Sequence, residues 1–434
     1  MISPDEAWQC IAAHAAPLPA EVVARREARG RVLAAALPAT VDVPAADVSA
    51  MDGFAVAGEV VPGEWRQVAA TVAAGAAPGA VLPPGQAIRI MTGAPLPAGA
   101  DRVVPVEATA GAGAADGTAR RDGAADGAGP REGVADGAAA VRDAGERVQL
   151  LAAAEPGEHV RRRGEVQRTG DELLPAGSRV TPGALALLAT HGYAEVPVHR
   201  APSVAVLATG DEVVPPDQEP GPGHLRDSHT DFLLAAGAAL GLRFTSLGIS
   251  PDDTAELTAR IGAGLAGHDV LVICGGVSMG EFDLVEGVLA GLGCRRRFDA
   301  VAVQPGKPMV FATHPGGLVF GLPGNPASVM VDFWLFVRPA LARLAGHPAG
   351  WWQPALQATL AAPLAAGTPG RDRFLAAEIA WGAAAGGGPL AHPLAPKGSH
   401  DLAAYARGNA LLRVRSGAPA AAAGAPCEVL LLPG

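Results

Sequence analysis

The pattern of apolar positions divides the chain into segments of different structure. Between Trp65 and Pro105, apolar and polar residues alternate between glycine and proline breaks, which predicts a small β-domain. From Ser203 onward, short β-branched runs are followed by stretches with helical spacing, which predicts a parallel, doubly wound sheet. Past His347 the pattern returns to short β segments. The fold class expected is therefore multidomain, α/β and β.

Four further segments carry helical signals. Ser3–Glu6 has the form of a capping box with proline at the first helical position. A second helix is predicted over Ala20–Ala36, and a short one over Thr181–Gly192. The longest apolar helix candidate, Ala327–Leu344, is interrupted by Asp332, Arg338 and Pro339. It therefore predicts a core helix and no membrane span.

The stretch with the clearest chemistry follows a predicted central strand, Val270–Cys274. The strand breaks into Gly275 and Gly276, followed by Ser278, before a helical pattern begins. A strand, a glycine turn and a helix can present backbone N–H groups to a phosphate. The acids that follow, including Asp283, then suggest a divalent cation beside the phosphate. The alternative is an ordinary turn with an acid that caps the helix.

Other polar motifs also fall where predicted strands end. They are Thr209–Glu212, Asp252, the turn Gln304–Pro308 with one lysine, and Gly321–Ser328, which opens the long helix with N–H groups free for an anion. In a doubly wound sheet, ligands bind at the carboxyl ends of the strands. The shared location of these motifs therefore predicts one site there.

Elsewhere the polar motifs are ambiguous. The loop Asp42–Val56 delivers acids into a turn, and Arg89–Pro95 is a strand that ends in a hydroxyl and glycine turn. Arg161–Arg163 could either clamp an anion or face water. Near the C-terminus, Pro369–Arg371 and Lys397–His400 could be plain loop.

Domain boundaries follow from these changes of pattern. We expect an N-terminal linker domain from residues 1–46 and 160–199, a small β-domain over 47–159, a doubly wound domain over 200–346 and a C-terminal β-domain over 347–434. Residues from about 108 to 145 are rich in Ala, Gly, Asp and Arg and lack large apolar side chains. Such a segment cannot bury enough surface to offset its ordering entropy, which predicts a disordered insertion.

Composition narrows the function classes. The 434 residues carry a formal net charge of −10, which argues against a general nucleic-acid binder. The four cysteines show no CxxC spacing, a pattern typical of reduced thiols in the cytoplasm. The N-terminus lacks the basic flank and apolar run of a secretion signal. A cytoplasmic protein without nucleic-acid or membrane partners is expected.

Taken together, the motifs resemble those of the molybdopterin molybdenumtransferase (MoeA) family, which also includes the E domain of gephyrin. The matching stretches are SAMDGFAV, RIMTGAPLPAGAD, RRRGE, ATGDE, GGVSMGEFD, QPGKP, GLPGNPAS and PGR. The resemblance implies four domains in an elongated homodimer, with each active site shared between subunits. It also implies insertion of molybdate into adenylylated molybdopterin with Mg²⁺ present and AMP released, giving molybdenum cofactor. The adenylylating enzyme and molybdoenzyme acceptors would be possible partners.

The resemblance also assigns roles to matching positions. The catalytic positions implied are Asp52, Thr92, Glu212, Asp252, Asp283 and Lys307, and three of them, Glu212, Asp252 and Asp283, would hold the metal. Asp52 and Thr92 would come from the partner subunit. The positions implied to bind the pterin substrate and its phosphates are Asp227, Ser228, Gly275, Gly276, Ser278, Pro305, Gly306, Gly324, Asn325, Ser328, Arg371 and Ser399.

Three positions depart from the family pattern. Val166 replaces a common Asp, Gln304 replaces a lysine found in many members, and His229 stands where Asn is common. They leave open a non-catalytic molybdopterin-binding or scaffold paralogue on the same fold. An enzyme of the adenylylating step is a further alternative, which the MDG segment and C-terminal β-domain disfavour. Nothing in the sequence separates molybdate from tungstate.

Overall fold

The computed structural model describes residues 1–111, 146–276, 284–353, 355–382, 387–394 and 397–433. Its contacts divide the chain into two compact units, which are described separately. Unit 1 contains residues 1–35, 176–189 and 193–434, and unit 2 contains residues 36–175 and 190–192. This division cuts through the predicted linker domain, so the four predicted domains remain a prediction.

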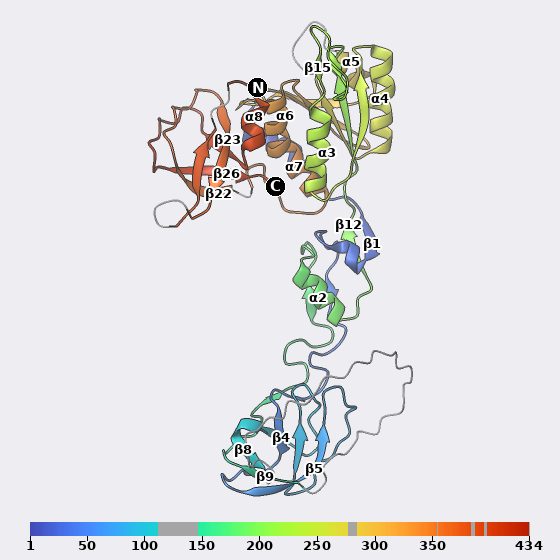
Figure 1. Ribbon diagram of the computed structural model, residues 1–434. Coiled ribbons are helices and arrows are strands. Elements are labelled where there is room, and N and C mark those ends of the chain that lie inside the picture. The colour runs from blue at the N-terminus through green and yellow to red at the C-terminus, as the bar shows by residue number, and fades with distance from the viewer. Residues whose placement is uncertain (112–145, 277–283, 354, 383–386, 395–396, 434) are drawn as a thin grey trace. The chain divides into compact units, whose positions relative to one another are not determined.

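The centre of unit 1 is a six-stranded sheet (Figure 1). Its order is β16 (Phe244–Ser250), β13 (Val204–Thr209), β17 (Val270–Cys274), β21 (Gly317–Leu322), β20 (Pro308–His314) and β18 (Arg295–Ala300). The first four strands are parallel, as predicted, but β20 runs antiparallel to both of its neighbours, β21 and β18. The short turn that joins β20 to β21 explains the difference, because only antiparallel neighbours can be connected so tightly.

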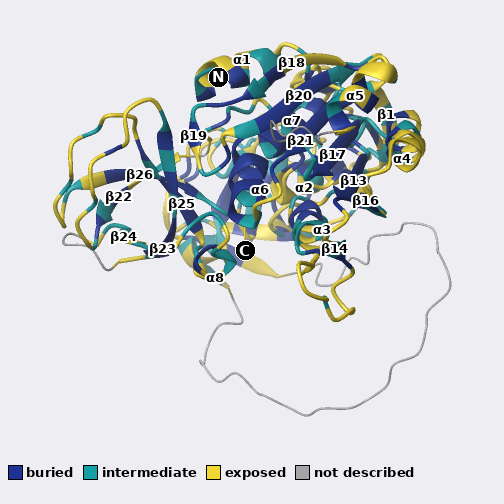
Figure 2. Cartoon of the chain, turned by 90° about the horizontal axis from the view of Figure 1, so that it is seen from above, coloured by how far each residue is buried: buried dark blue, intermediate teal, exposed yellow. Residues whose placement is uncertain are grey.

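Helices cover both faces of this sheet. On one face, α3 (His229–Ala239) and the long helix at residues 326–344 pack on Val204 and Val206. On the other face, α4 (Thr254–Gly267) and α5 (Leu284–Gly291) pack on the alternate side chains of the same strand (Figure 1). The central strands are consequently buried throughout, as the dark blue colour in Figure 2 shows. The doubly wound architecture predicted from the pattern is confirmed.

The long helix consists of α6 (Pro326–Asp332), a π-helical turn (Phe333–Val337) and α7 (Arg338–Leu344). All five residues of the π-helical turn are buried, which confirms a core helix. Pro339 has no N–H for the regular i to i−4 bond, and this explains an irregular turn just before it. No described helix is long and apolar enough to cross a membrane.

At the N-terminus, one helix prediction is confirmed and one is wrong. Helix α1 (Pro4–Ala12) has both capping-box hydrogen bonds between Ser3 and Glu6. The helix predicted over Ala20–Ala36 is instead β1 (Ala20–Ala24), followed by a 3₁₀ turn at Arg25–Ala28. Two β-branched valines and a partner strand, β12 (Glu195–His199), outweigh the helical spacing. Helix α2 (Pro182–Thr190) forms where it was expected.

The C-terminal β segments form a second six-stranded sheet. Its strands are β19 (Val303–Gln304), β23 (Asp372–Ala380), β24 (Leu390–Pro393), β22 (Ala355–Leu360), β26 (Pro426–Leu431) and β25 (Ala410–Val414), beside a helix α8 (Leu402–Arg407). Strand β19 precedes the lysine-bearing turn, yet it pairs with β23. This pairing brings the turn next to the C-terminal sheet.

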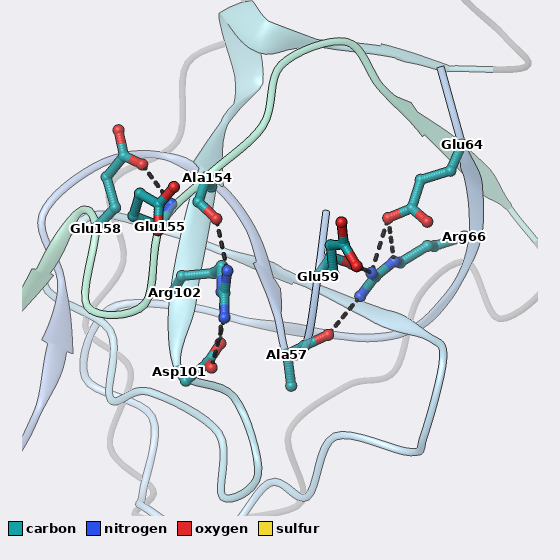
Figure 3. Close-up of polar contacts among 9 residues, drawn as sticks. All are labelled: Ala57, Glu59, Glu64, Arg66, Asp101, Arg102, Ala154, Glu155 and Glu158. Carbon is teal, nitrogen blue, oxygen red and sulfur yellow. Dashed lines mark hydrogen bonds and ion pairs between the residues drawn. The ribbon is translucent and has the colours of Figure 1, made fainter. Parts of the chain in front are cut away.

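Unit 2 is built on a sheet ordered β7 (Arg102–Pro105), β4 (Gly53–Val56), β6 (Ala87–Ile90), β5 (Trp65–Val72), β9 (Arg147–Leu150) and β8 (Thr109–Gly111). Two buried arginines of this sheet, Arg66 and Arg102, bind carbonyl groups of residues outside the strands (Figure 3). Arg102 donates to the carbonyl of Ala154 at 2.6 Å, and Arg66 donates to the carbonyls of Ala57 and Glu59.

The first residues of the predicted disordered insertion are ordered. Thr109–Gly111 form β8, because their backbone pairs with β9 although their side chains are small or polar. The remainder, residues 112–145, lies outside the described part of the chain.

Candidate functional site

A cavity of about 850 Å³ lies between the lysine-bearing turn and the C-terminal sheet of unit 1. The predicted site residues that line it come from four separate segments: Pro305, Gly306, Lys307, Asn325, Ser328, Arg371 and Ser399. Sequence motifs about 100 residues apart thus contribute to one cavity. Gly324, also predicted, is exposed and does not line it.

The lining is basic. It includes Lys307, Arg371 and Arg373, and no aspartate or glutamate among the described residues. The Nε of Arg373 is buried without a hydrogen-bond partner in the described structure, so no protein group compensates this donor. Three cations without a facing carboxylate favour an anionic ligand, since guanidinium groups match the geometry of phosphate and carboxylate oxygens.

Close packing fixes the position of the lysine-bearing turn. Gly306 has φ +109°, and a Cβ there would lie 2.2 Å from Oδ1 of Asp332. Both carboxylate oxygens of Asp332 are buried without a hydrogen-bond partner in the described structure, and burial raises its pKa well above the ordinary value. Only glycine fits between this carboxyl group and the cavity.

The start of α6 differs from expectation. The sequence predicted N–H groups free for an anion, but Ala327 N–H donates to the carbonyl of Ser399 at 3.1 Å. The N–H groups of Ser328 and Val329 both donate to the carbonyl of Asn325. The C-terminal loop has docked on this helix end, so ligand contacts here fall to side chains such as the Ser328 hydroxyl.

An acidic cluster lies at the carboxyl ends of β13 and β16. Asp252 N–H donates to Oδ1 of Asp211 at 3.0 Å, and the Glu212 carboxylate lies over Gly210. Burial raises the pKa of Asp252, and the negative charges of Asp211 and Glu212 raise it further. Carboxylates that repel one another in this way are stabilised by a bound cation.

The described carboxylates do not complete a metal site by themselves. No three His, Cys, Asp or Glu side chains in the described residues are placed to hold a metal ion. The third predicted ligand, Asp283, and the predicted phosphate contact Ser278 lie within 277–283, outside the described residues.

The two predicted glycines follow β17 with φ +90° and +62°. A Cβ on Gly275 would lie 2.6 Å from the carbonyl oxygen of Thr209, and one on Gly276 would lie 2.7 Å from Val285. These glycines therefore allow the turn to pack against neighbouring strands and α5. Their contact with a phosphate stays a prediction.

Asp227 supports the start of α3. Its Oδ1 accepts from the backbone N–H groups of His229 and Thr230 at 2.9 and 3.1 Å. The Nε2 of His229 and Oγ1 of Thr230 are buried without a partner in the described structure. Asp227 thus has a structural role, and the ligand role predicted for it and for Ser228 remains untested.

In unit 2, the structure brings together the two residues predicted to act as a pair. Oδ1 of Asp52 accepts from the backbone N–H and the hydroxyl of Thr92, at 2.7 and 2.9 Å. These bonds lower the pKa of Asp52, and the charge of Arg89 lowers it slightly further. The result is an ionised, exposed carboxylate held in one orientation.

The arginine run of unit 2 pairs with acids. Arg162 Nη1 lies 2.7 Å from Asp47 Oδ2, and Arg163 Nε lies 2.5 Å from Asp42 Oδ2. Two of the three arginines thus bind the preceding loop, a third possibility besides the two that the sequence left open.

Three relevant residues were not singled out from the sequence. Asp211 adjoins the predicted Glu212, while Arg373 and Tyr405 line the cavity. Arg373 follows the predicted Arg371 by two residues and lies in β23, so its closeness to the Pro369–Arg371 motif was the only signal for it.

The chain is similar along most of its length to known protein families, sequences and structures. Three family descriptions match in order: "MoeA N-terminal region (domain I and II)" over residues 2–192, "Probable molybdopterin binding domain" over 205–343, and "MoeA C-terminal region (domain IV)" over 357–432. A molybdopterin molybdenumtransferase of Nostoc sp. is 36% identical over 76% of this chain and 71% of its own length. The chain belongs to the MoeA family.

Other MoeA relatives agree. Molybdopterin molybdenumtransferase 2 of Mycobacterium tuberculosis is 33% identical over 93% of both chains. The crystal structure of a MoeA protein of molybdopterin biosynthesis from Pyrococcus horikoshii has a TM-score of 0.76 and 29% identity, with complete coverage of both chains. The MoeA resemblance and fold class expected from the sequence are confirmed.

Proposed function

We propose that this chain acts in molybdenum cofactor biosynthesis as a molybdopterin molybdenumtransferase, inserting molybdenum from molybdate into adenylylated molybdopterin and releasing AMP. Its family and full-length match support the class of enzyme. The basic cavity supports the assignment most directly, because molybdate and a pterin phosphate are both anions. Lys307, Arg371 and Arg373 would neutralise their charge, and Ser328 and Ser399 would donate hydrogen bonds.

The acidic cluster suits Mg²⁺, which prefers carboxylate oxygens together with substrate phosphates. Glu212 and Asp252 would hold the ion with Asp283, and Asp211 would keep Asp252 in place through its hydrogen bond. When bound, Mg²⁺ would neutralise the phosphates between which the adenylate bond breaks. The side chains of this chain position the two anions and exclude competing orientations.

The Asp52–Thr92 pair fits a homodimer in which each site receives this pair from the partner subunit. A carboxylate kept ionised by two hydrogen bonds is suited to orient a cationic or hydrogen-bond-donating group of the bound substrate.

A cytoplasmic location is in keeping with four free cysteines. The adenylylating enzyme would supply the substrate, and molybdoenzymes would accept the product.

A single-turnover assay tests this proposal. Purified protein is mixed with adenylylated molybdopterin, molybdate and Mg²⁺, and AMP and metal-loaded cofactor are followed together. Both products are expected from the wild type, and K307Q should lose most of the rate. K397Q is the matched control, because Lys397 is an exposed lysine outside the cavity lining.

Tight pterin binding without either product would refute the enzyme assignment. It would instead support a molybdopterin-binding scaffold, in which Gln304 has replaced a needed charge. Gln304 is exposed and lines the cavity, whereas Val166 is exposed in unit 2. Running the assay with tungstate in place of molybdate would identify the preferred oxyanion.

A further inference from the structure

Unit 1 contains a second cavity, of about 740 Å³, whose residues have no part in the proposed reaction. Its described lining holds five basic side chains and no acidic one: Arg29, Arg31, Arg179, Arg338 and His347. The whole chain has a formal charge of −10, so this concentration of cations runs opposite to its average. The excess of positive charge around this cavity therefore needs an electrostatic explanation.

These basic side chains come from segments distant in the sequence, and burial lowers the pKa of His347, so the cations are the four arginines. Arg29 and Arg31 follow the 3₁₀ turn at Arg25–Ala28, and Arg179 lies just before α2. Arg338 begins α7, and His347 follows that helix. The fold gathers these side chains around one space, and this convergence distinguishes a cavity lining from a charged helix face.

The contacts of these arginines leave much of their charge uncompensated. Arg338 is largely buried and donates to the backbone carbonyls of Trp334 and Gln353, so burial lowers its pKa to about 10. Arg31 pairs with Glu21, but its Nε is buried without a partner in the described structure.

Arg29 and Arg179 are exposed and form no ion pair among the described residues. Their charges are therefore free to act on a ligand. Neither residue requires a protein partner to keep its place, so both can be replaced with little effect on folding.

Helix ends alone do not account for the cluster. The cavity is lined by the C-terminal ends of α3 and α7, and each end contributes about half a negative charge. Together they offset about one of the four guanidinium charges, and the carboxylate of Glu21 offsets that of Arg31. Thr181 and Pro182, at the N-terminal end of α2, also line the cavity and add positive potential. The balance remains clearly positive.

We propose that this cavity binds a phosphate monoester of about nucleotide size, at a site separate from the reaction. Arginine side chains bind phosphate oxygens in a bidentate manner. The volume falls within the range of about 300–1,000 Å³ that is usual for small-molecule sites. Leu240, Leu242 and Leu341 supply an apolar wall for an organic group, such as a nucleoside base.

The test is titration calorimetry of the full-length protein with AMP and, separately, with inorganic phosphate. Titrations are made in the K307Q background, which weakens anion binding at the first cavity. R29Q/R179Q removes two exposed cations of the second cavity. R26Q is the matched control, because Arg26 is exposed on the preceding turn and does not line the cavity.

AMP affinity is expected to fall by about tenfold or more in R29Q/R179Q, the usual effect of losing a charge-assisted hydrogen bond. R26Q should stay within about twofold of its parent, as expected for a distant surface charge. Tighter binding of AMP than of inorganic phosphate supports the proposal, whereas equal binding of the two would overturn the assignment of a nucleotide-sized monoester.

Equal AMP affinity in R29Q/R179Q and R26Q would overturn the proposal, as would the absence of binding by both probes. Sedimentation velocity of the same variants tests whether the arginines instead contact a second copy of the chain. A change in oligomeric state in R29Q/R179Q without a change in phosphate affinity would show that the arginines face a second copy of the chain, and would also overturn it.

Discussion

The buried ion pair between Asp372 and Arg413 should show strong energetic coupling. Arg413 donates to Oδ2 of Asp372 from Nη2 and Nε, at 2.5 and 2.8 Å, and the two side chains are only 8% and 10% exposed. Oδ1 of Asp372 also accepts from the backbone N–H of Ser416. The guanidinium group lies over Trp351, 4.6 Å from the ring centroid. Neither charged group can reach water if its partner is removed.

Removing one partner of such a pair costs about 3 kcal/mol or more, because the remaining charge stays buried and unpaired. D372N keeps the shape and the acceptor for Ser416, and R413M keeps the apolar stem over Trp351. The double variant D372N/R413M leaves no unpaired charge. We expect it to cost about 3 kcal/mol, like either single variant, which gives a coupling free energy of about 3 kcal/mol.

Hydrogen exchange is the suitable assay, because a chain with several domains does not unfold in two states. Protection of the amides in β23 and β25 reports the local free energy of opening. Additive losses in the double variant would refute this account of the pair. Since Arg371 and Arg373 flank Asp372, each single variant should also bind molybdate more weakly, and the double variant should recover part of that affinity.

Three further predictions concern single positions. G306A should lower molybdate affinity and destabilise unit 1 by about 1–3 kcal/mol, because its Cβ would lie 2.2 Å from Asp332 Oδ1. G306A/D332A should recover part of the lost affinity and part of the lost stability. A double variant that recovers neither would contradict the clash. D252N should raise the free energy of unfolding at pH 7 in the absence of metal. The pKa of Asp252 is raised in the folded state, so its negative charge lowers stability once the pH rises above the unfolded pKa of 3.8. The gain should vanish well below pH 3.8, and an equal gain at pH 7 and at this low pH would count against charge repulsion. T92V should raise the pKa of Asp52 by removing the hydroxyl donor, which should move the acidic limb of the activity–pH profile to higher pH. If the limb does not move, Asp52 is not the group whose titration produces it.

The sequence was sufficient to predict features that depend on local pattern. The buried strand Val270–Cys274 and the helix after Ser3 follow from apolar runs and capping chemistry, and both form as expected. The helix predicted over Ala20–Ala36 failed because pairing with Glu195–His199, some 170 residues away, decides that segment. Such long-range pairing leaves no local signal.

The site was predictable in its residues but less so in its contacts. Lys307, Ser328 and Arg371 were identified from motifs, and the structure places all three around one cavity. The motif at Asn325 could not show that Ser399 would occupy the N–H of Ala327, since that contact depends on docking of the C-terminal loop. Arg373 was missed because it lies two residues beyond the Pro369–Arg371 motif, and its position at the cavity depends on the fold.

The sharing of strands between the α/β part of unit 1 and its C-terminal sheet limits how a ligand can enter. Strand β19 joins that sheet, the N–H of Asp372 donates to the carbonyl of Ala302, and Ser399 binds the start of α6. A hinge that opened the cavity would have to break these main-chain bonds, unlike a hinge in a free linker. Entry of substrate into the cavity should therefore depend on the motion of exposed side chains such as Lys307. The rate of release of the finished cofactor should likewise depend on the length and charge of the side chain at this position.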